Sequence, residues 1–154
     1  MSRLSRHQAF METAFVWAKR STCSRLNVGA VVVINDRIVS HGYNGSPPGA
    51  PHCRGNECPG IHGCRETIHA EQNALARVPR GLEDAPKQIY TTHSPCLVCA
   101  DSCRYHLVNR VYFSVPFRDL SGLDYLIDSK IEVFQVLPAG YVMQWSSKQI
   151  IEIV

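Results

Sequence analysis

The first block of apolar residues in the chain predicts an amphipathic helix over 5–20. Its apolar residues recur at the spacing of one helix face: Phe10, Met11, Ala14, Trp17 and Ala18. Ser5 and Gln8 stand three residues apart before this block, which is the spacing of a capping box. We therefore expect a helix that begins at Ser5 and packs its apolar side on a core.

After this helix the pattern changes to strands that alternate with helices. A valine-rich run over 28–34 predicts a buried strand, the Asn-Asp pair at 35–36 a turn, and 37–43 a returning strand. Further helices are expected over 67–77, 95–106 and 120–128, and further strands over 88–92, 110–115 and 131–136. Because strands separated by helices tend to be parallel, we expect an α/β fold in which a mixed five-stranded sheet has helices on both faces.

In two stretches the apolar residues follow neither helical nor strand spacing. Segment 44–65 holds five glycines, four prolines and three cysteines, and a loop of this length inside a compact domain is usually functional or cross-linked. The tail from residue 137 predicts no clear element. Its end, 149–154, is compatible with an edge strand or with a partner contact.

Composition restricts the class of protein. A length of 154 residues with 45% hydrophobic and 19% charged residues fits a single globular domain over 1–154. The net charge of +3 is smaller than expected for a dedicated nucleic-acid binder. No apolar run is long enough to cross a membrane or to act as a signal peptide. We expect a soluble cytoplasmic protein, in the host cytoplasm if the gene is viral, with neither a nucleic-acid nor a membrane partner.

The chain has seven cysteines: Cys23, Cys53, Cys58, Cys64, Cys96, Cys99 and Cys103. In a reducing cytoplasm this number favours metal binding over disulfides. The alternative is that they are small buried residues that pack like other hydrophobic side chains. Their spacing relative to nearby histidines favours the metal interpretation.

His69, Cys96 and Cys99 form a candidate catalytic metal site. Cys96 and Cys99 stand three apart at an expected helix start, where their sulfurs share one face and the positive helix end stabilises thiolates. His69 lies in the first turns of the preceding helix, which starts at the same edge of a parallel sheet. One imidazole and two thiolates leave the fourth position of zinc to water. Glu71, two residues from His69, is then placed to carry protons, whereas a purely structural zinc would leave it without a role.

These residues resemble the motifs of the cytidine deaminase superfamily, and within it those of the deoxycytidylate (dCMP) deaminases, over about 20–136. The superfamily motifs are His69-Ala70-Glu71 and Pro95-Cys96-Leu97-Val98-Cys99. The subfamily resemblance rests on four further stretches: Arg-Ser-Thr-Cys at 20–23, Val-Gly-Ala-Val at 28–31, Gly-Tyr-Asn-Gly-Ser-Pro-Pro-Gly at 42–49 and Cys-Arg-Glu-Thr-Ile-His at 64–69.

The resemblance implies the three-layer cytidine deaminase fold and one zinc-dependent nucleotide deaminase domain. It implies hydrolytic deamination of dCMP to dUMP and ammonia, with Glu71 as the catalytic proton carrier and dUMP passing to thymidylate synthesis. An asparagine at the position of Asn44 contacts the nucleotide sugar in the family, and Gly42 and Gly45 beside it allow a ligand to approach the backbone. The alternative for this segment is a plain turn.

The remaining substrate contacts are less specific. The substrate-binding candidates are Asn44, Ala70, Ser24, Arg25, Ser94 and Phe117. For the phosphate we expect Arg25 or Arg118, helped by the hydroxyls of Ser24 and Ser46, although solvated surface arginines are the alternative. Phe117 stands where the family commonly has a tyrosine. Its ring can stack on the base or sugar but has no hydroxyl to donate, and core packing is the alternative.

A second, structural zinc is expected on Cys23, Cys53, Cys58 and Cys64. Four thiolates make a closed tetrahedral site that would hold the glycine-rich segment. His62 or His52 is able to replace one of these cysteines, and two disulfides or free thiols are the alternatives. Cys103, one turn beyond Cys99, is expected to be simply buried.

The resemblance also implies regulation and assembly. Members of the family are often hexameric, activated by dCTP and inhibited by dTTP, with Mg²⁺ accompanying the effector. Candidate effector contacts are Tyr43, Gly45 and Ser46. Two other functions stay open: a zinc deaminase that acts on a nucleic-acid base, as tRNA adenosine deaminases do, and a catalytically inactive zinc protein that binds nucleotides.

Overall fold

The structure of the protein is a computed structural model that describes residues 2–53 and 67–152 of the 154 residues. These residues form one mixed sheet in the order β2-β1-β3-β4-β5-β6-β7. Its strands are β1 (Gly29–Ile34), β2 (Arg37–Tyr43), β3 (Lys87–His93), β4 (Val108–Val115), β5 (Glu132–Val136), β6 (Val142–Gln144) and β7 (Gln149–Glu152). The helices are α1 (Arg6–Ala18), α2 (Ala70–Ala76), α3 (Leu97–Tyr105) and α4 (Ser121–Asp128).

Helices connect the parallel strands, whereas the antiparallel pairs β1–β2, β5–β6 and β6–β7 are each consecutive along the chain. Strands β3, β4 and β5 are parallel because α3 and α4 connect them, whereas β2, β1 and β3 are antiparallel neighbours. The mixed sheet predicted from the sequence is confirmed, but its strand count of five was wrong. The tail adds β6 and β7 as an antiparallel extension of β5. The edge strand given as one alternative for 149–154 is confirmed by β7, which lies at the edge of the sheet with all four of its residues exposed.

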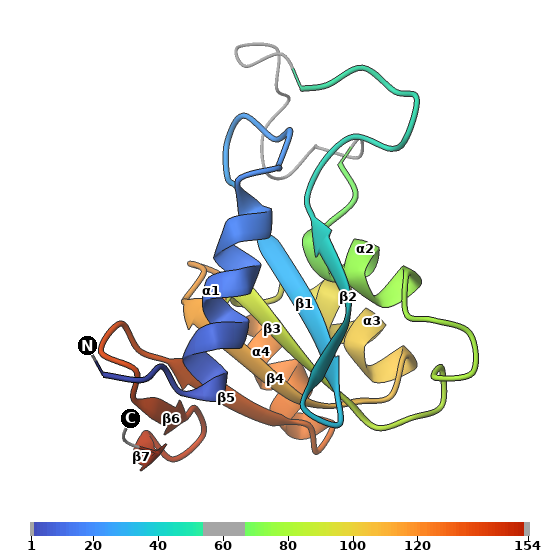
Figure 1. Ribbon diagram of the computed structural model, residues 1–154. Helices are drawn as coiled ribbons and strands as arrows, with labels where there is room; N and C mark the ends of the chain where they lie inside the picture. Colours follow the sequence, from blue (N-terminus) through green and yellow to red (C-terminus); the bar gives the residue numbers. More distant parts are fainter. Residues whose placement is uncertain (1, 54–66, 153–154) are drawn as a thin grey trace.

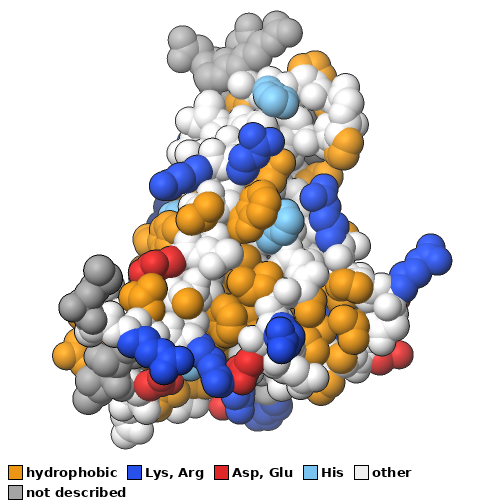
Figure 2. Space-filling model, viewed as in Figure 1, with side chains coloured by type: hydrophobic (Ala, Val, Ile, Leu, Met, Phe, Trp, Pro, Cys, Tyr) orange, Lys and Arg blue, Asp and Glu red, His pale blue; other side chains and the backbone are white. Residues whose placement is uncertain are grey.

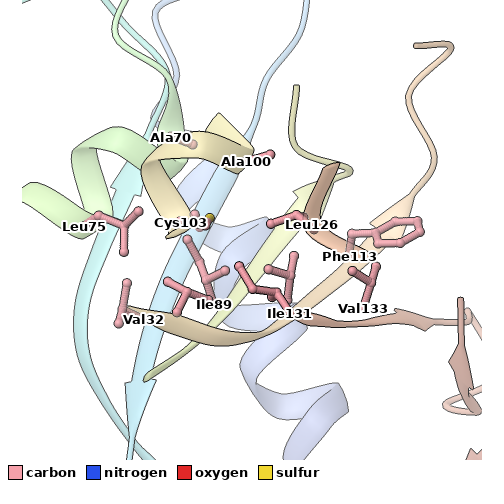
Figure 3. Packing of buried hydrophobic residues seen from close by; sticks show 14 of the residues in the cluster. Val32, Ala70, Leu75, Ile89, Ala100, Cys103, Phe113, Leu126, Ile131 and Val133 are labelled. Carbon is pink, nitrogen blue, oxygen red and sulfur yellow. The ribbon is translucent and has the colours of Figure 1, made fainter. Parts of the chain in front are cut away.

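The sheet separates two hydrophobic layers, with α1 on one face and α2, α3 and α4 on the other (Figure 1). On the α2 side, Val32 and Ile89 from the sheet meet Leu75, Ala100 and Leu126 from the helices (Figure 3). On the α1 side, side chains of α1 pack against a second set of strand residues that includes stacked tyrosines. The predicted three layers with helices on both faces are therefore confirmed.

Two helices start later than the sequence pattern predicted. The helix expected over 67–77 begins at Ala70, and the one expected over 95–106 begins at Leu97. The residues before them, His69 and Cys96, have extended backbone and act as N-caps. At the N-terminus the predicted capping box of Ser5 and Gln8 is present and starts α1 at Arg6. Within the described residues, no helix combines the length and apolar character needed to cross a bilayer.

A glycine brings α2 close to the sheet. A side chain at Gly42 on β2 would collide with the backbone oxygen of Ala70 and lie 2.5 Å from the backbone nitrogen of Ala74. Ser40, two residues earlier on the same strand, donates its hydroxyl to the Ala74 oxygen at 2.7 Å. The start of α2, and with it the position of His69, is thereby fixed against β2.

Candidate functional site

Three metal-binding side chains lie together where α2 and α3 begin. The Nδ1 atom of His69 is 3.1 Å from the sulfur of Cys99 and 3.4 Å from that of Cys96. The ligand atoms of the three residues all lie within 4.8 Å of one another. In the part of the chain that the structure describes, this is the one group of three or more His, Cys, Asp or Glu side chains arranged in this way. The structure thus brings together the trio predicted from the sequence.

Helix starts position all three ligands. His69 is the N-cap of α2, one position before the first turn in which it was expected, and Cys96 is the N-cap of α3. Cys99 lies in the first turn of α3 and is fully buried. Because β3 ends at His93 and leads into Cys96, the site lies at the carboxyl end of a central strand, which is where ligands bind in open α/β sheets.

The donor set fits zinc. A hydrogen bond with Cys99 lowers the pKa of the Cys96 thiol to about 4, while the same contact and burial raise the pKa of Cys99. One imidazole nitrogen and two thiolates are ligands that zinc prefers, and three protein ligands leave its fourth position open.

Glu71 is buried beside this trio. It is the second residue of α2, and its side chain is 4% exposed. Burial is the largest influence on the carboxyl and raises its pKa, so it holds a proton more readily than an exposed glutamate does. The hydroxyl of Thr91 on β3 lies 3.3 Å from its Oε1 atom. A buried acid beside a metal site is suited to proton transfer.

Asn44 is buried after the end of β2, and its side chain forms hydrogen bonds with the segment between α1 and β1. Its Oδ1 atom accepts hydrogen bonds from the Ser21 hydroxyl at 2.6 Å and from the Val28 N–H at 2.9 Å. Its Nδ2 atom donates to the backbone oxygen of Leu26 at 2.7 Å. These three bonds leave one N–H of the amide for a ligand, so the expected contact with the nucleotide sugar depends on that single hydrogen.

Ser94 joins the turn before α3 to the segment after β4. Its N–H donates to the oxygen of Val115 at 3.0 Å, and its hydroxyl accepts the N–H of Phe117 at 2.7 Å. Phe117 is held in a half-buried position near this turn. Ala70 is fully buried and belongs to the core, so a substrate contact from Ala70 would come from its backbone.

The other predicted contacts lie on the surface. Ser24, Arg25 and Arg118 are exposed, and the Ser24 hydroxyl lies 3.1 Å from the sulfur of Cys53. This contact places the segment that carries Cys23 next to Cys53. The other two proposed ligands of a second zinc, Cys58 and Cys64, lie outside the described residues, as does His62. Cys103 is fully buried, as expected.

The effector candidates flank the base of the glycine-rich segment. Tyr43 turns its ring away from α2 and lies parallel to Trp17 of α1, with ring centres 6.4 Å apart. Gly45 and Ile68 exchange two backbone hydrogen bonds of 3.1 and 2.8 Å, so the chain enters and leaves this segment at one point. The Ser46 N–H donates to the Thr22 hydroxyl at 3.1 Å.

The sequence analysis missed Thr91. Residues on one face of a strand recur every second position, and Ile89 and Thr91 of β3 both face α2. A threonine at this spacing, close to the carboxyl end of a buried strand, is the signal that could have identified it.

The sequence matches a known protein family over most of its length. Residues 4–115 match the family described as the cytidine and deoxycytidylate deaminase zinc-binding region. ComE operon protein 2 of Bacillus subtilis is 39% identical over 120 residues, which are 77% of this chain and 64% of that protein. The deoxycytidylate deaminase of Schizosaccharomyces pombe is 36% identical over 100 residues, which are 59% of this chain and 31% of that protein. The chain therefore spans less than two thirds of the length of these curated relatives.

A solved structure shares most of the architecture. The dCMP deaminase of cyanophage S-TIM5, crystallised in complex with dCMP and dUMP, has a TM-score of 0.75 and 33% identity to this chain. The likeness covers 88% of this chain and 99% of the phage protein. The family match includes His69, Cys96 and Cys99, which supports assigning Zn²⁺ to this trio. The chain belongs to the cytidine and deoxycytidylate deaminase family.

Proposed function

We propose that the protein catalyses the hydrolytic deamination of dCMP to dUMP and ammonia. The observation that carries this proposal is the buried carboxyl of Glu71 beside a candidate metal site to which the described residues contribute three ligands. A structural zinc site has four protein ligands and no need of a buried acid next to it. An open metal position next to a proton carrier suits hydrolysis.

Two relatives support dCMP as the substrate. The cyanophage protein was crystallised with dCMP and dUMP, and the Schizosaccharomyces pombe relative is a deoxycytidylate deaminase. One face of the molecule also supports a small nucleotide over a nucleic acid. On the face shown in Figure 2, Lys and Arg side chains are spread among uncharged ones instead of following one track along which a phosphate backbone could lie.

Zinc, Glu71 and Thr91 have separate roles in the proposed reaction. When bound, zinc supplies the Lewis-acid chemistry that makes a water molecule acidic near neutral pH. Glu71 takes one proton from the water that attacks C4 of the cytosine and passes it to N3, and then takes the proton of the new C4 hydroxyl and passes it to the amino group, which leaves as ammonia. Thr91 orients the carboxylate through its hydroxyl. One water is consumed and one ammonia is released for each dUMP formed.

The substrate contacts belong to the same proposal. The remaining N–H of Asn44 donates to the sugar, the backbone of Ala70 and the turn at Ser94 contact the base, and the ring of Phe117 stacks on the nucleotide. Ser24 and Arg25, or Arg118 from the other side, bind the phosphate. The exposure of these three residues leaves them accessible to a ligand.

The finer expectations also remain part of the proposal. They comprise a hexamer, activation by dCTP and inhibition by dTTP with Mg²⁺, a second zinc that includes Cys23 and Cys53, and a cytoplasmic enzyme that supplies dUMP for thymidylate synthesis. The contact between Ser24 and Cys53 supports the second zinc. The hydrogen bonds between Gly45 and Ile68 support an effector route, because Ile68 directly precedes His69.

Ammonia release tests the function. Zinc-loaded protein is assayed with dCMP, deoxycytidine and a tRNA, each with and without dCTP, next to the Glu71→Gln variant. We expect turnover of dCMP, little with the other two, and a loss of about 100-fold or more in the variant at unchanged zinc content. Inactivity on dCMP at full zinc loading, or equal rates for both proteins, would contradict the proposal.

A further inference from the structure

His93 belongs neither to the metal trio nor to the proposed proton path. It is the last residue of β3, two residues beyond Thr91 and three before Cys96. Its side chain is half-buried, and burial lowers the pKa of its imidazole below the ordinary value. The ring is therefore neutral at pH 7.

The hydroxyl of Thr92 determines which nitrogen of this ring carries the proton. Thr92 is fully buried, and its Oγ1 atom accepts the N–H of Gly29 at 3.2 Å and lies 2.9 Å from Nδ1 of His93. A buried hydroxyl also donates its proton, and among residues 2–53 and 67–152 its one further partner is this Nδ1 atom. Thr92 therefore donates to Nδ1, and His93 carries its own proton on Nε2.

His93 ends the strand that leads into the metal site, three residues before the N-cap Cys96. Thr91, two residues earlier on this strand, reaches Glu71 from β3. His93 follows at the strand end where α2 and α3 begin. Within the described part of the chain, Nε2 makes no hydrogen bond, so its N–H is available to a ligand.

We propose that His93 donates a hydrogen bond from Nε2 to an acceptor oxygen of the bound nucleotide, on the pyrimidine carbonyl or on the phosphate. The inference rests on the proposed function, because it takes a cytosine nucleotide as the ligand. Thr92 holds the donor in place before the substrate arrives, so the bond forms without reordering the side chain. The contact is a binding interaction present throughout the reaction, which lowers KM and leaves kcat unchanged.

Two conservative replacements separate this role from a structural one. Glutamine places its amide nitrogen near the position of Nε2, whereas asparagine places its amide near Nδ1 and keeps only a partner for Thr92. We expect His93→Gln to keep KM for dCMP within about twofold of the wild type. We expect His93→Asn to raise KM about fivefold to tenfold, the loss of one neutral hydrogen bond, with kcat little changed. If His93 merely supports Thr92, the order is reversed, and that result would overturn the inference.

Product binding and substrate choice complete the test. The Kd of dUMP, measured by titration calorimetry on zinc-loaded protein, should rise in His93→Asn in parallel with KM. If His93→Asn raises KM for dCMP but not for deoxycytidine, the acceptor oxygen is on the phosphate. If KM rises equally for both substrates, the acceptor oxygen is on the pyrimidine. His106→Gln, at the far end of α3, is the matched control. Unchanged KM and Kd in both His93 variants refute the contact, whereas a wild type that binds dUMP but does not deaminate dCMP contradicts only the proposed function.

Discussion

The hydroxyl of Thr91 on β3 lies 3.3 Å from the carboxylate oxygen Oε1 of Glu71 on α2. Both side chains are buried, so this hydrogen bond acts where solvent does not compete with it. The sheet thereby controls the orientation of the acid that we propose as the proton carrier.

The Thr91→Val variant should therefore lower kcat for dCMP about fivefold to tenfold, because a methyl group of similar size removes this hydrogen bond together with the one to the backbone oxygen of His93 at 3.0 Å. Thr91→Ser keeps the hydroxyl and should retain most of the activity. Zinc content, measured by elemental analysis, should be the same in all three proteins. Full activity of the valine variant would show that the contact does not orient Glu71.

Removal of zinc should abolish activity without unfolding the protein. The two hydrophobic layers are built from residues other than the three metal ligands, so circular dichroism of chelator-treated protein should retain its helix and strand signal. Readdition of zinc should restore the activity.

Two buried cysteines of α3 provide a matched pair for this experiment. Cys99→Ala should bind one equivalent of zinc fewer than the wild type, whereas Cys103→Ala should bind as much. Equal zinc loss in both variants would contradict the assignment of Cys99 as a ligand.

Asn44→Ala should disturb the segment between α1 and β1. It removes three hydrogen bonds, to Ser21, Val28 and Leu26, and we expect a loss of about 2–4 kcal/mol in the free energy of unfolding together with a raised KM. Urea unfolding and steady-state kinetics measure the two effects. Asn27→Ala, the same replacement on an exposed residue, should change neither. A normal KM in a destabilised Asn44→Ala protein would remove Asn44 from the substrate contacts.

Lys87 should prove important for stability even though it lies at the other end of β3 from the site. Its side chain is 1% exposed, and its ammonium donates to the backbone oxygens of Glu83, Ala85 and His106 at 2.6, 2.9 and 2.7 Å. Lys87→Met leaves these oxygens without a donor, so the free energy of unfolding should fall by about 2–4 kcal/mol. Lys19→Met, on an exposed lysine, is the control, and equal unfolding midpoints for the two variants would refute the prediction.

Stability should decrease as the pH falls from 7.5 to 5.5. Burial is the largest influence on four histidines and lowers the pKa of each: His7, His41, His93 and His106. In the unfolded chain these groups take up protons near pH 6.5, whereas in the folded protein they stay neutral to lower pH. The unfolded state then binds more protons than the folded state, so the free energy of unfolding decreases as the pH decreases.

Urea unfolding of zinc-loaded protein at several pH values measures this slope. The double variant His41→Gln/His106→Gln keeps the metal ligands and should show a shallower decrease than the wild type. A steeper decrease in the variant would mean that these two residues gain protons on folding.

The metal trio and most of the fold could be predicted from the sequence because their signals are local. Cys96 and Cys99 are separated by one helical turn, and Glu71 follows His69 by two residues. Buried strands such as β1 consist of continuous apolar runs, whose burial the structure confirms. The helix starts differ by two or three residues because His69 and Cys96 act as caps, which hydrophobic periodicity does not detect.

Contacts between distant residues could not be predicted in this way. The partners of Asn44 lie 16 to 23 residues away and are brought to it only by the pairing of β1 with β2. The two strands of the tail are short and lie at the end of the sheet. Strand β6 contributes Val142 to the core, whereas all residues of β7 are exposed. Neither strand therefore shows a strong alternation of apolar and polar residues.

The pair of hydrogen bonds between Gly45 and Ile68 has an evolutionary consequence. It closes the chain on itself immediately after Asn44 and immediately before His69. The entropy of closing a loop between these two points grows slowly with the number of residues in it. Descendants of this gene can therefore change the length of that stretch at a small cost in stability, while the backbone bonds at its two ends keep Asn44 and His69 in place.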